Sequence, residues 1–363
     1  MASIALVRSD VIVGVDTHKD QHVAVVLDGL GGRLGELFLP ASADGYTELL
    51  AWARGHGRVI AFGVEGTGSY GAGLASFLRR HAHKVIEVNR PARQADRRLA
   101  GKSDTIDAEH AAREVLAGTA TNTPKTADGA IEAIRLIKIA RDGAVKARSR
   151  AMITLKASLV TGRDELRAEL EPLTDHKLVL ACAQFADMLE DPADPVAAMR
   201  YLLGSLARQW LALHDEIKTH FKLLERATAA AAPDLVEAFG IGPDVAAEML
   251  ITAGDNTDRV RSEAAFAKLC GACPIPAGSG KTNGRHRLNR GGNRQANAAL
   301  YRTVIVRMRW HVPTIAYVAR RTAEGLSKKE IIRCLKRFVA REVFALLPAP
   351  ATSQIAKKSR LDP

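Results

Sequence analysis

The sequence predicts an α/β domain at the amino-terminal end of the chain, followed by a largely helical region. Three observations support this prediction. Short apolar runs separated by glycine-rich turns fill the first 120 residues. From about residue 128, apolar residues recur at intervals of three and four, which is the spacing of helices. The length of 363 residues allows two ordinary cores with a connector.

The first 120 residues alternate between strand patterns and helix patterns. Runs rich in Val, Ile and Leu predict strands at 11–15, 22–28, 33–39, 59–65 and 84–88. Helical spacing predicts helices at 44–54, 70–82, 91–100 and 104–117. This order is that of the ribonuclease H-like fold, in which three antiparallel strands are extended by parallel strands through crossover helices.

The middle of the chain predicts a helical arm. Segments 130–160 and 198–227 both carry apolar residues at helical spacing, whereas the polar stretch between them, with EDPADP at 190–195, predicts a loop. We therefore expect two long helices packed antiparallel as a coiled coil. Such an arm is a spacer in its simplest role, and it can also mediate dimerisation.

The region after residue 232 predicts a small, mostly helical domain. Residues 233–254 read as helix, G-I-G-P turn and helix, which is the form of a helix-hairpin-helix. In that motif, turn amides at a helix amino terminus bind a nucleic-acid phosphate; a plain helical turn is an equal alternative. We expect domains at 1–120, 121–230 and 231–347, with a disordered tail at 348–363.

The charge of the chain indicates a polyanionic partner. The formal net charge is +12, and residues 281–341 hold sixteen Lys or Arg against two Glu. No apolar run approaches the ~18 residues that span a bilayer, and an Asp follows the start too early for a signal peptide. With few cysteines as well, we expect a cytoplasmic protein that associates with the nucleoid when bound to DNA.

Four carboxylates occupy positions at which the predicted fold brings side chains together. Asp16 ends the first strand and Glu65 ends the fourth, and these strands are neighbours in a ribonuclease H-like sheet. Asp104 and Asp107 lie three apart at the start of a helix. Turn chemistry or helix capping explains each Asp alone, but four converging carboxylates favour Mg²⁺ or Mn²⁺ and two-metal phosphodiester chemistry.

The segment PAGSGKTNGRHR at 276–287 contains G-K-T, as a phosphate-binding loop does. A Walker A motif needs a glycine where this chain has Ile275, so the match is accidental. Ser279 lies between two glycines and precedes several cations. A flexible Gly-Ser linker is the simpler interpretation; the alternative is a nucleophilic hydroxyl among phosphate-binding side chains. Those candidate nucleic-acid ligands are Lys281, Arg285, Arg287, Arg290 and Arg294.

Six motifs, in order, make the chain similar to a known family: VDTHKD, VEGTGSYG, KSDTIDAEHAA, FGIGPDVAAEML, LCGACPIPAGSGKTNG and RGGNRQANAALY. The chain resembles the IS-one-ten family of insertion-sequence recombinases, which are DEDD transposases. The resemblance implies a RuvC-like first domain, a coiled-coil arm and a transposase domain with a serine. It implies that Asp16, Glu65, Asp104 and Asp107 bind metal and that Ser279 joins covalently to DNA. It also implies donor DNA, target DNA and a bridge RNA as partners, and a homodimer or tetramer.

Two other functions remain open from the sequence. A RuvC-like Holliday-junction resolvase or nuclease would use the same carboxylates with water as the nucleophile, and would leave no protein-linked DNA. A non-catalytic protein that binds RNA or DNA would not need a complete set of four carboxylates. Ser279 separates the recombinase from the first alternative, and metal-dependent cleavage separates it from the second.

Overall fold

The computed structural model describes residues 10–89, 103–189, 191, 193–278, 286–287, 289 and 291–348. The chain divides into two compact units, Met1–Thr126 and Ala127–Pro363. The helix predicted at 91–100 and, apart from Pro348, the tail predicted at 348–363 lie outside the described residues. Among the described helices, none is both long enough and apolar enough to cross a bilayer.

A five-stranded mixed sheet forms the centre of the first unit. Its strands are β1 (Asp10–Thr17), β2 (Gln21–Asp28), β3 (Arg33–Pro40), β4 (Arg58–Glu65) and β5 (Val85–Val88). The order across the sheet is β3-β2-β1-β4-β5. Strands β1, β2 and β3 pair antiparallel, whereas β4 and β5 continue the sheet parallel to β1. The predicted strands and the α/β class are confirmed.

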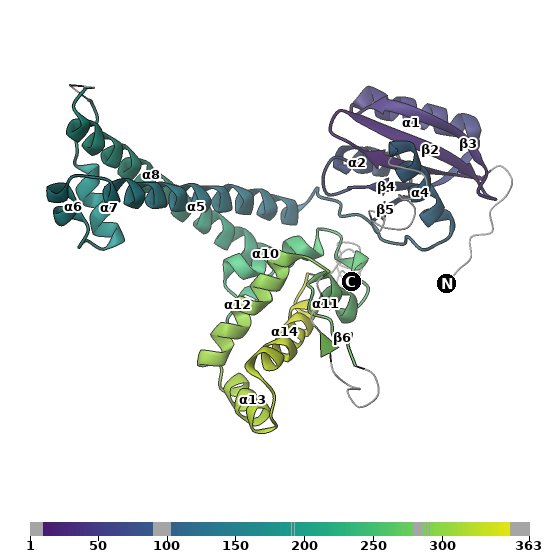
Figure 1. The fold of residues 1–363 in the computed structure, drawn as a ribbon. Coiled ribbons are helices and arrows are strands. Elements are labelled where there is room, and N and C mark those ends of the chain that lie inside the picture. Colours follow the sequence, from purple (N-terminus) through teal and green to yellow (C-terminus); the bar gives the residue numbers. More distant parts are fainter. Residues whose placement is uncertain are drawn as a thin grey trace, which may run out of the picture. The chain divides into compact units, whose positions relative to one another are not determined.

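Helices cover both faces of this sheet (Figure 1). Helices α1 (Ala43–His56) and α2 (Ala72–Arg80) pack on the face that carries Val13, Val15 and Val64. Helix α4 (Asp104–Leu116) packs on the opposite face, which carries Ile12 and Ala61. Because successive side chains of a strand point to opposite faces, the even positions of β1 face α4.

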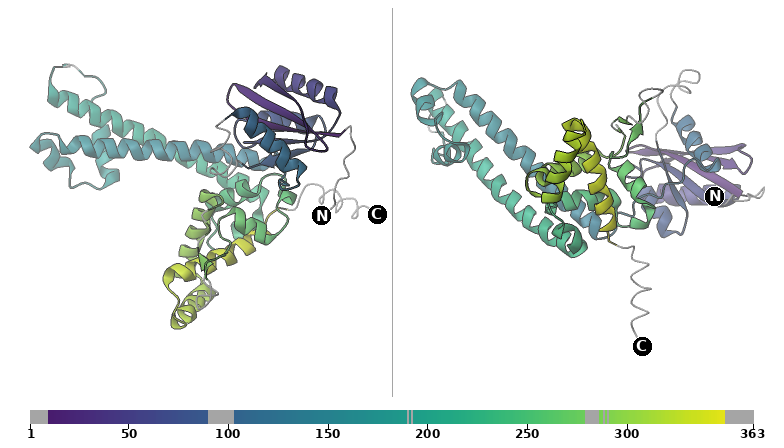
Figure 2. Two further views of the ribbon diagram at one scale, coloured as in Figure 1. Left: turned by 45° about the vertical axis from the view of Figure 1, so that its right-hand side comes forward. Right: turned by 90° about the horizontal axis from the view of Figure 1, so that it is seen from below.

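Two long helices form the arm in the second unit, α5 (Ala130–Val160) and α8 (Pro195–Ala231). The guanidinium of Arg141 lies 5.8 Å from the centre of the Phe221 ring, and that of Arg148 lies 5.2 Å from the Trp210 ring. Residues later in α5 therefore contact residues earlier in α8, so the two helices are antiparallel (Figure 2). The helical pair is confirmed; that it is a coiled coil stays a prediction.

The connection between the arm helices is not a simple loop, and this prediction was wrong. It contains α6 (Asp164–Leu170) and α7 (Asp175–Ala183). Leu166, Leu170 and Leu178 of these short helices are buried in one cluster with Leu155 and Leu203 of the arm. Polar residues between these leucines obscure the helical spacing in the sequence. The leucine cluster closes the far end of the arm. Pro195, the last residue of EDPADP, begins α8, and Asp194 caps that helix.

In the remaining described residues of the second unit, helices joined by turns predominate, and one short β ladder is present. The helices are α9 (Pro233–Glu237), α10 (Pro243–Ala253), the 3₁₀ turn η1 (Thr257–Arg259), α11 (Glu263–Leu269), α12 (Arg294–Trp310), α13 (Val312–Ala323) and α14 (Lys328–Ala345). Buried Leu250, Phe266 and Leu300 share one core with Ile134 and Leu224 of the arm. The base of the arm is therefore part of this helical core, and the three-domain division stays a prediction.

The predicted helix–turn–helix at 233–254 has the expected form. Helices α9 and α10 flank a turn in which Gly240 has a φ of +76°, a conformation that other residues rarely adopt. Pro243 stands in the first turn of α10, where a missing N–H costs nothing. The form alone does not distinguish a phosphate-binding hairpin from a plain turn, so that role stays a prediction.

Candidate active site

Asp16 and Glu65 are neighbours at one edge of the sheet. Strands β1 and β4 run parallel with Val15 opposite Val64, so the next residue of each strand lies at the same level. Both side chains are almost fully buried, Asp16 at 7% and Glu65 at 4% exposure. Thr17 donates a hydrogen bond to the Glu65 carbonyl at 3.0 Å, which ties the two strand ends together.

Two glycines allow α4 to reach this edge. A Cβ on Gly14 would lie 2.0 Å from the Ala108 carbonyl oxygen, and one on Gly63 would lie 2.8 Å from the Ala111 carbonyl oxygen. Helix and sheet therefore meet backbone to backbone, closer than any side chain allows. Positions 14 and 16 point to the same face of β1, so the amino terminus of α4 lies over the face that Asp16 occupies.

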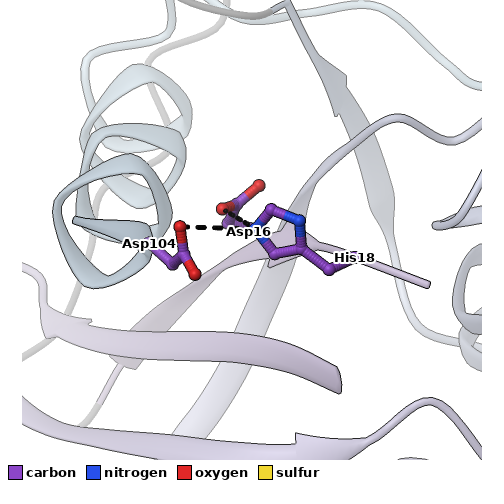
Figure 3. A group of neighbouring side chains, drawn as sticks. All are labelled: Asp16, His18 and Asp104. Atoms are coloured by element: carbon purple, nitrogen blue, oxygen red, sulfur yellow. Dashed lines mark hydrogen bonds and ion pairs between the residues drawn. The ribbon is translucent and has the colours of Figure 1, made fainter. Parts of the chain in front are cut away.

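The first turn of α4 completes an acidic group around one imidazole (Figure 3). His18 Nε2 lies 3.1 Å from Asp16 Oδ2 and 3.3 Å from Asp104 Oδ1. One ligand atom from each of these three residues lies within 4.8 Å of the others, as a metal site requires. The structure thus brings Asp104, from a helix far along the chain, to the end of β1.

Electrostatics of the site disfavour a charged Asp16. Burial raises the pKa of the Asp16 carboxyl above its ordinary value, the charge of His18 lowers it, and Asp107 and Asp104 raise it further. Asp107 therefore lies close enough to Asp16 for its charge to act on this carboxyl. A bound cation would offset both the burial and the repulsion.

His18 is the member of this group that sequence reasoning missed. It stands two residues after Asp16, in the VDTHKD motif, and its side chain is 46% exposed. The signal was an imidazole directly beyond a strand that ends in a carboxylate. Only the position of α4 shows that the ring lies between two Asp side chains.

The predicted residues of the second unit are described only in part. Ser279, Lys281, Arg285 and Arg290 lie outside the described residues. Strand β6 (Ile275–Pro276) pairs antiparallel with β7 (His286–Arg287), a short ladder that was not predicted from the sequence. The ladder holds together the two ends of the connection that contains Ser279. Arg287 and Arg294, both described, are exposed.

Many cations of the basic segment have partners inside the protein. Arg307 makes a bidentate pair with Glu342, at 2.6 and 2.8 Å. Arg337 and Arg341 share Glu263, and Arg302 pairs with Asp244 of α10. The charge available to a polyanion is therefore smaller than the count of residues suggested, because tertiary pairs neutralise part of it.

Comparison with known proteins gives two family matches. Residues 13–162 match a model described as a DEDD transposase of IS110, and residues 233–319 match one described as a transposase of the IS116/IS110/IS902 family. A curated relative is the insertion element IS116 uncharacterized 44.8 kDa protein of Streptomyces clavuligerus. It is 24% identical over 396 aligned positions, which cover 95% of this chain and 98% of the relative.

Proposed function

Because this chain belongs to the IS110 family of transposases, we propose that it cuts and exchanges DNA strands through a covalent serine intermediate at a divalent-metal site. The observation that carries this proposal is the group of Asp16, His18 and Asp104 where β1 ends and α4 begins. A transposase has to neutralise the negative charge of the phosphodiester that it cuts. A cation held by these carboxylates would do so, and in the described residues this group is the best candidate for such a site.

The side chains at this edge fit a hard divalent cation. Asp16, Glu65, Asp104 and Asp107 offer carboxylate oxygens, which suit Mg²⁺ or Mn²⁺. Imidazole is not a preferred ligand of Mg²⁺, so we assign His18 to orient Asp16 through a hydrogen bond and Asp104 through an ion-pair contact. When bound, such a cation supplies Lewis-acid polarisation of the scissile phosphate. A ribonuclease H-like, RuvC-like identity for this unit is part of the proposal, supported by the strand order.

The nucleophile in this proposal is Ser279. Its hydroxyl oxygen attacks the phosphorus and loses its proton; the bond to the 3′ oxygen breaks, and that oxygen gains a proton. A 3′ hydroxyl then attacks the phosphoserine of the partner strand, which restores the serine and conserves the number of phosphodiester bonds. Exposed Arg287, at the base of the connection that contains Ser279, would hold a phosphate nearby.

The remaining partners rest on the family resemblance. A bridge RNA would pair with donor and target DNA, so sequence choice would lie in base pairing rather than in protein contacts. Ser279 and the carboxylates belong to different compact units. We propose that a homodimer or tetramer assembled on nucleic acid brings them together, and that the free protein is nearly inert.

A denaturing gel with labelled donor DNA and the bridge RNA tests the serine mechanism. The wild-type protein should give a protein-linked band and a recombinant product. Ser279→Ala should give neither, although it should still bind DNA and RNA. Ser205→Ala, a serine of the arm, is a matched control and should behave as the unchanged protein. Recombination by Ser279→Ala, or metal-dependent cleavage with no linked band, would establish the water-using nuclease instead.

A further inference from the structure

A cavity in the helical part of the second unit holds features that the proposed chemistry does not use. It has a volume of about 670 Å³, within the range of small-ligand sites. Helices α13 and α14 line it on one side, and residues 271–274 with β7 line it on the other. Its described lining carries six Lys or Arg against one Glu.

The strongest feature is a buried lysine whose partner among the described residues is an amide rather than a carboxylate. Lys336 lines the cavity at 6% exposure. Within the part of the chain that the structure describes, its ammonium bonds only to Asn297 Oδ1, at 2.8 Å. Asn297 is itself held in place, since its Nδ2 donates to the carbonyls of Cys270 and Gly271. A buried ammonium with a neutral partner and open space beside it is suited to an anion.

A second cation, Arg333, lies one helical turn before Lys336 on α14. Its guanidinium forms a long ion pair with Glu330 Oε1, at 3.9 Å. The other oxygen of Glu330, Oε2, accepts hydrogen bonds from the amide and the hydroxyl of Ser327 at the start of α14. Burial, and then the charge of Arg333, lower the pKa of Lys336, a cost that a bound anion would remove.

Aromatic surface accompanies these charges. The rings of Tyr317 and Phe338 meet edge to face with centres 5.6 Å apart, and both line the cavity. Phe338 remains 47% exposed, so part of its ring is available for stacking. Arg320 lies over the Tyr317 ring at 5.4 Å. A planar ring system attached to a phosphate combines the two chemistries that this lining offers.

We propose that this cavity binds one unstacked nucleotide of a nucleic-acid strand, with its phosphate at Lys336 and Arg333 and its base against Phe338. The inference rests on the proposed function only in taking nucleic acid as the partner. A duplex cannot place a paired base in a cavity of this size, so the site selects a nucleotide that has left its stack. Strand exchange produces such nucleotides wherever pairing partners change.

Binding of full-length protein to matched 16-base-pair duplexes, with and without one bulged nucleotide, tests this proposal. Loss of a base stacked on an aromatic ring lowers affinity about 5- to 150-fold, so we expect the bulged duplex to bind about tenfold more tightly. DNA and RNA versions are both measured. A ratio above about five on either backbone supports the cavity and identifies the sugar that it accepts; a ratio near one on both overturns it.

Substitutions in the cavity lining test whether the preference for the bulged duplex arises from the cavity. Phe338→Ala and Arg333→Ala should each bring the ratio toward one, and Lys336→Met should do so if circular dichroism shows that it folds. Phe38→Ala is the matched control, because Phe38 is 52% exposed on β3 and lies outside the cavity lining. If Phe338→Ala and Arg333→Ala keep the ratio of the control, the cavity is not the site.

The same preparations separate this inference from the proposed function. Asp16→Ala should lose strand cleavage and keep the preference for the bulge. Cleavage without any preference overturns the nucleotide cavity alone. A preference without metal-dependent cleavage in the unchanged protein overturns the proposed chemistry alone.

Discussion

Carboxylates in the two units of this molecule face opposite surroundings. Burial raises the pKa of Asp16 in the sheet unit, and although the charge of His18 lowers it, the carboxylates Asp107 and Asp104 raise it further. Asp244 of the helical unit is partly buried, with 27% of its side chain exposed, and Lys138, Arg141 and Arg302 all lie within 3.0 Å of its oxygens. Burial acts to raise the pKa of Asp244, but these cations lower it overall.

The comparison distinguishes Asp244, whose charge stabilises the fold, from Asp16, whose charge destabilises it. Asp244 joins α5, α10 and α12 through its ion pairs, so its charge holds the base of the arm to the helical core. Asp16 has the His18 imidazole beside it, yet its pKa is raised, so its ionisation works against folding. A protein keeps such a group where a ligand or a reaction requires it.

The largest effect expected is on activity, from Asp16→Ala. Cleavage of donor DNA should fall by about 10³-fold or more, because the substitution removes a ligand of the proposed metal site. When a chelator removes divalent metal at neutral pH, the free energy of unfolding of Asp16→Ala should equal or exceed that of the wild-type protein, because the buried charge and its repulsion are gone. Gel assays and urea unfolding measure the two quantities.

Asp20→Ala is the matched control for that substitution. Asp20 is exposed in the turn that follows β1, and its loss should change neither quantity appreciably. An Asp16→Ala variant that cleaves DNA normally would show that the sheet edge is a structural cluster. The contrast between the two buried aspartates would then have no functional meaning.

The second effect, on both stability and activity, comes from Gly14→Ala. The added methyl would lie 2.0 Å from the Ala108 carbonyl oxygen and 2.3 Å from the Ala112 nitrogen, so α4 must move away from the sheet. We expect a loss of about 3 kcal/mol in the free energy of unfolding. Cleavage by the folded fraction should also fall, because Asp104 and Asp107 move with α4.

Gly55→Ala provides the comparison for this change. Gly55 lies in α1, and a Cβ there meets nothing within 4 Å. Alanine at that position should be neutral or stabilising by up to about 1 kcal/mol. Equal unfolding curves for the two variants would contradict the close contact between α4 and β1.

The smallest effect expected is that of Asp244→Asn. Removal of the charge should cost about 2 kcal/mol of stability at neutral pH, since three cations lose a shared partner. The folded pKa of Asp244 lies below the ordinary 3.8, so its contribution is present above that pH. The contribution is lost as the pH falls through the folded pKa. Below that pH, the wild-type protein and Asp244→Asn should have the same free energy of unfolding.

Asp234→Asn tests whether that cost is specific. Asp234 also stands in the first turn of a helix, but it is exposed on α9. Its replacement should change stability by less than about 0.5 kcal/mol. A loss at Asp244 that does not depend on pH would mean that hydrogen bonding, rather than charge, joins the arm to the core.

Local signals explain which parts of the molecule were predictable from the sequence. Strands that alternate with helices leave apolar runs and glycine turns, and Asp16 and Glu65 were recognisable because each ends such a run. The role of His18 and the contact of Gly14 with Ala108 depend on where α4 packs, which no local pattern contains. Pairing of the basic segment with carboxylates likewise depends on tertiary structure.

The antiparallel register of the arm has a consequence for how its length can change. From Arg141 to Arg148 on α5, the contacts move from Phe221 back to His214 on α8, seven residues on each helix. A deletion in one helix alone would shift every later contact and open the leucine cluster at the tip. Removal of seven residues from each helix would keep both ends packed and shorten the arm by about 10 Å. The length of the arm can therefore change only in matched steps.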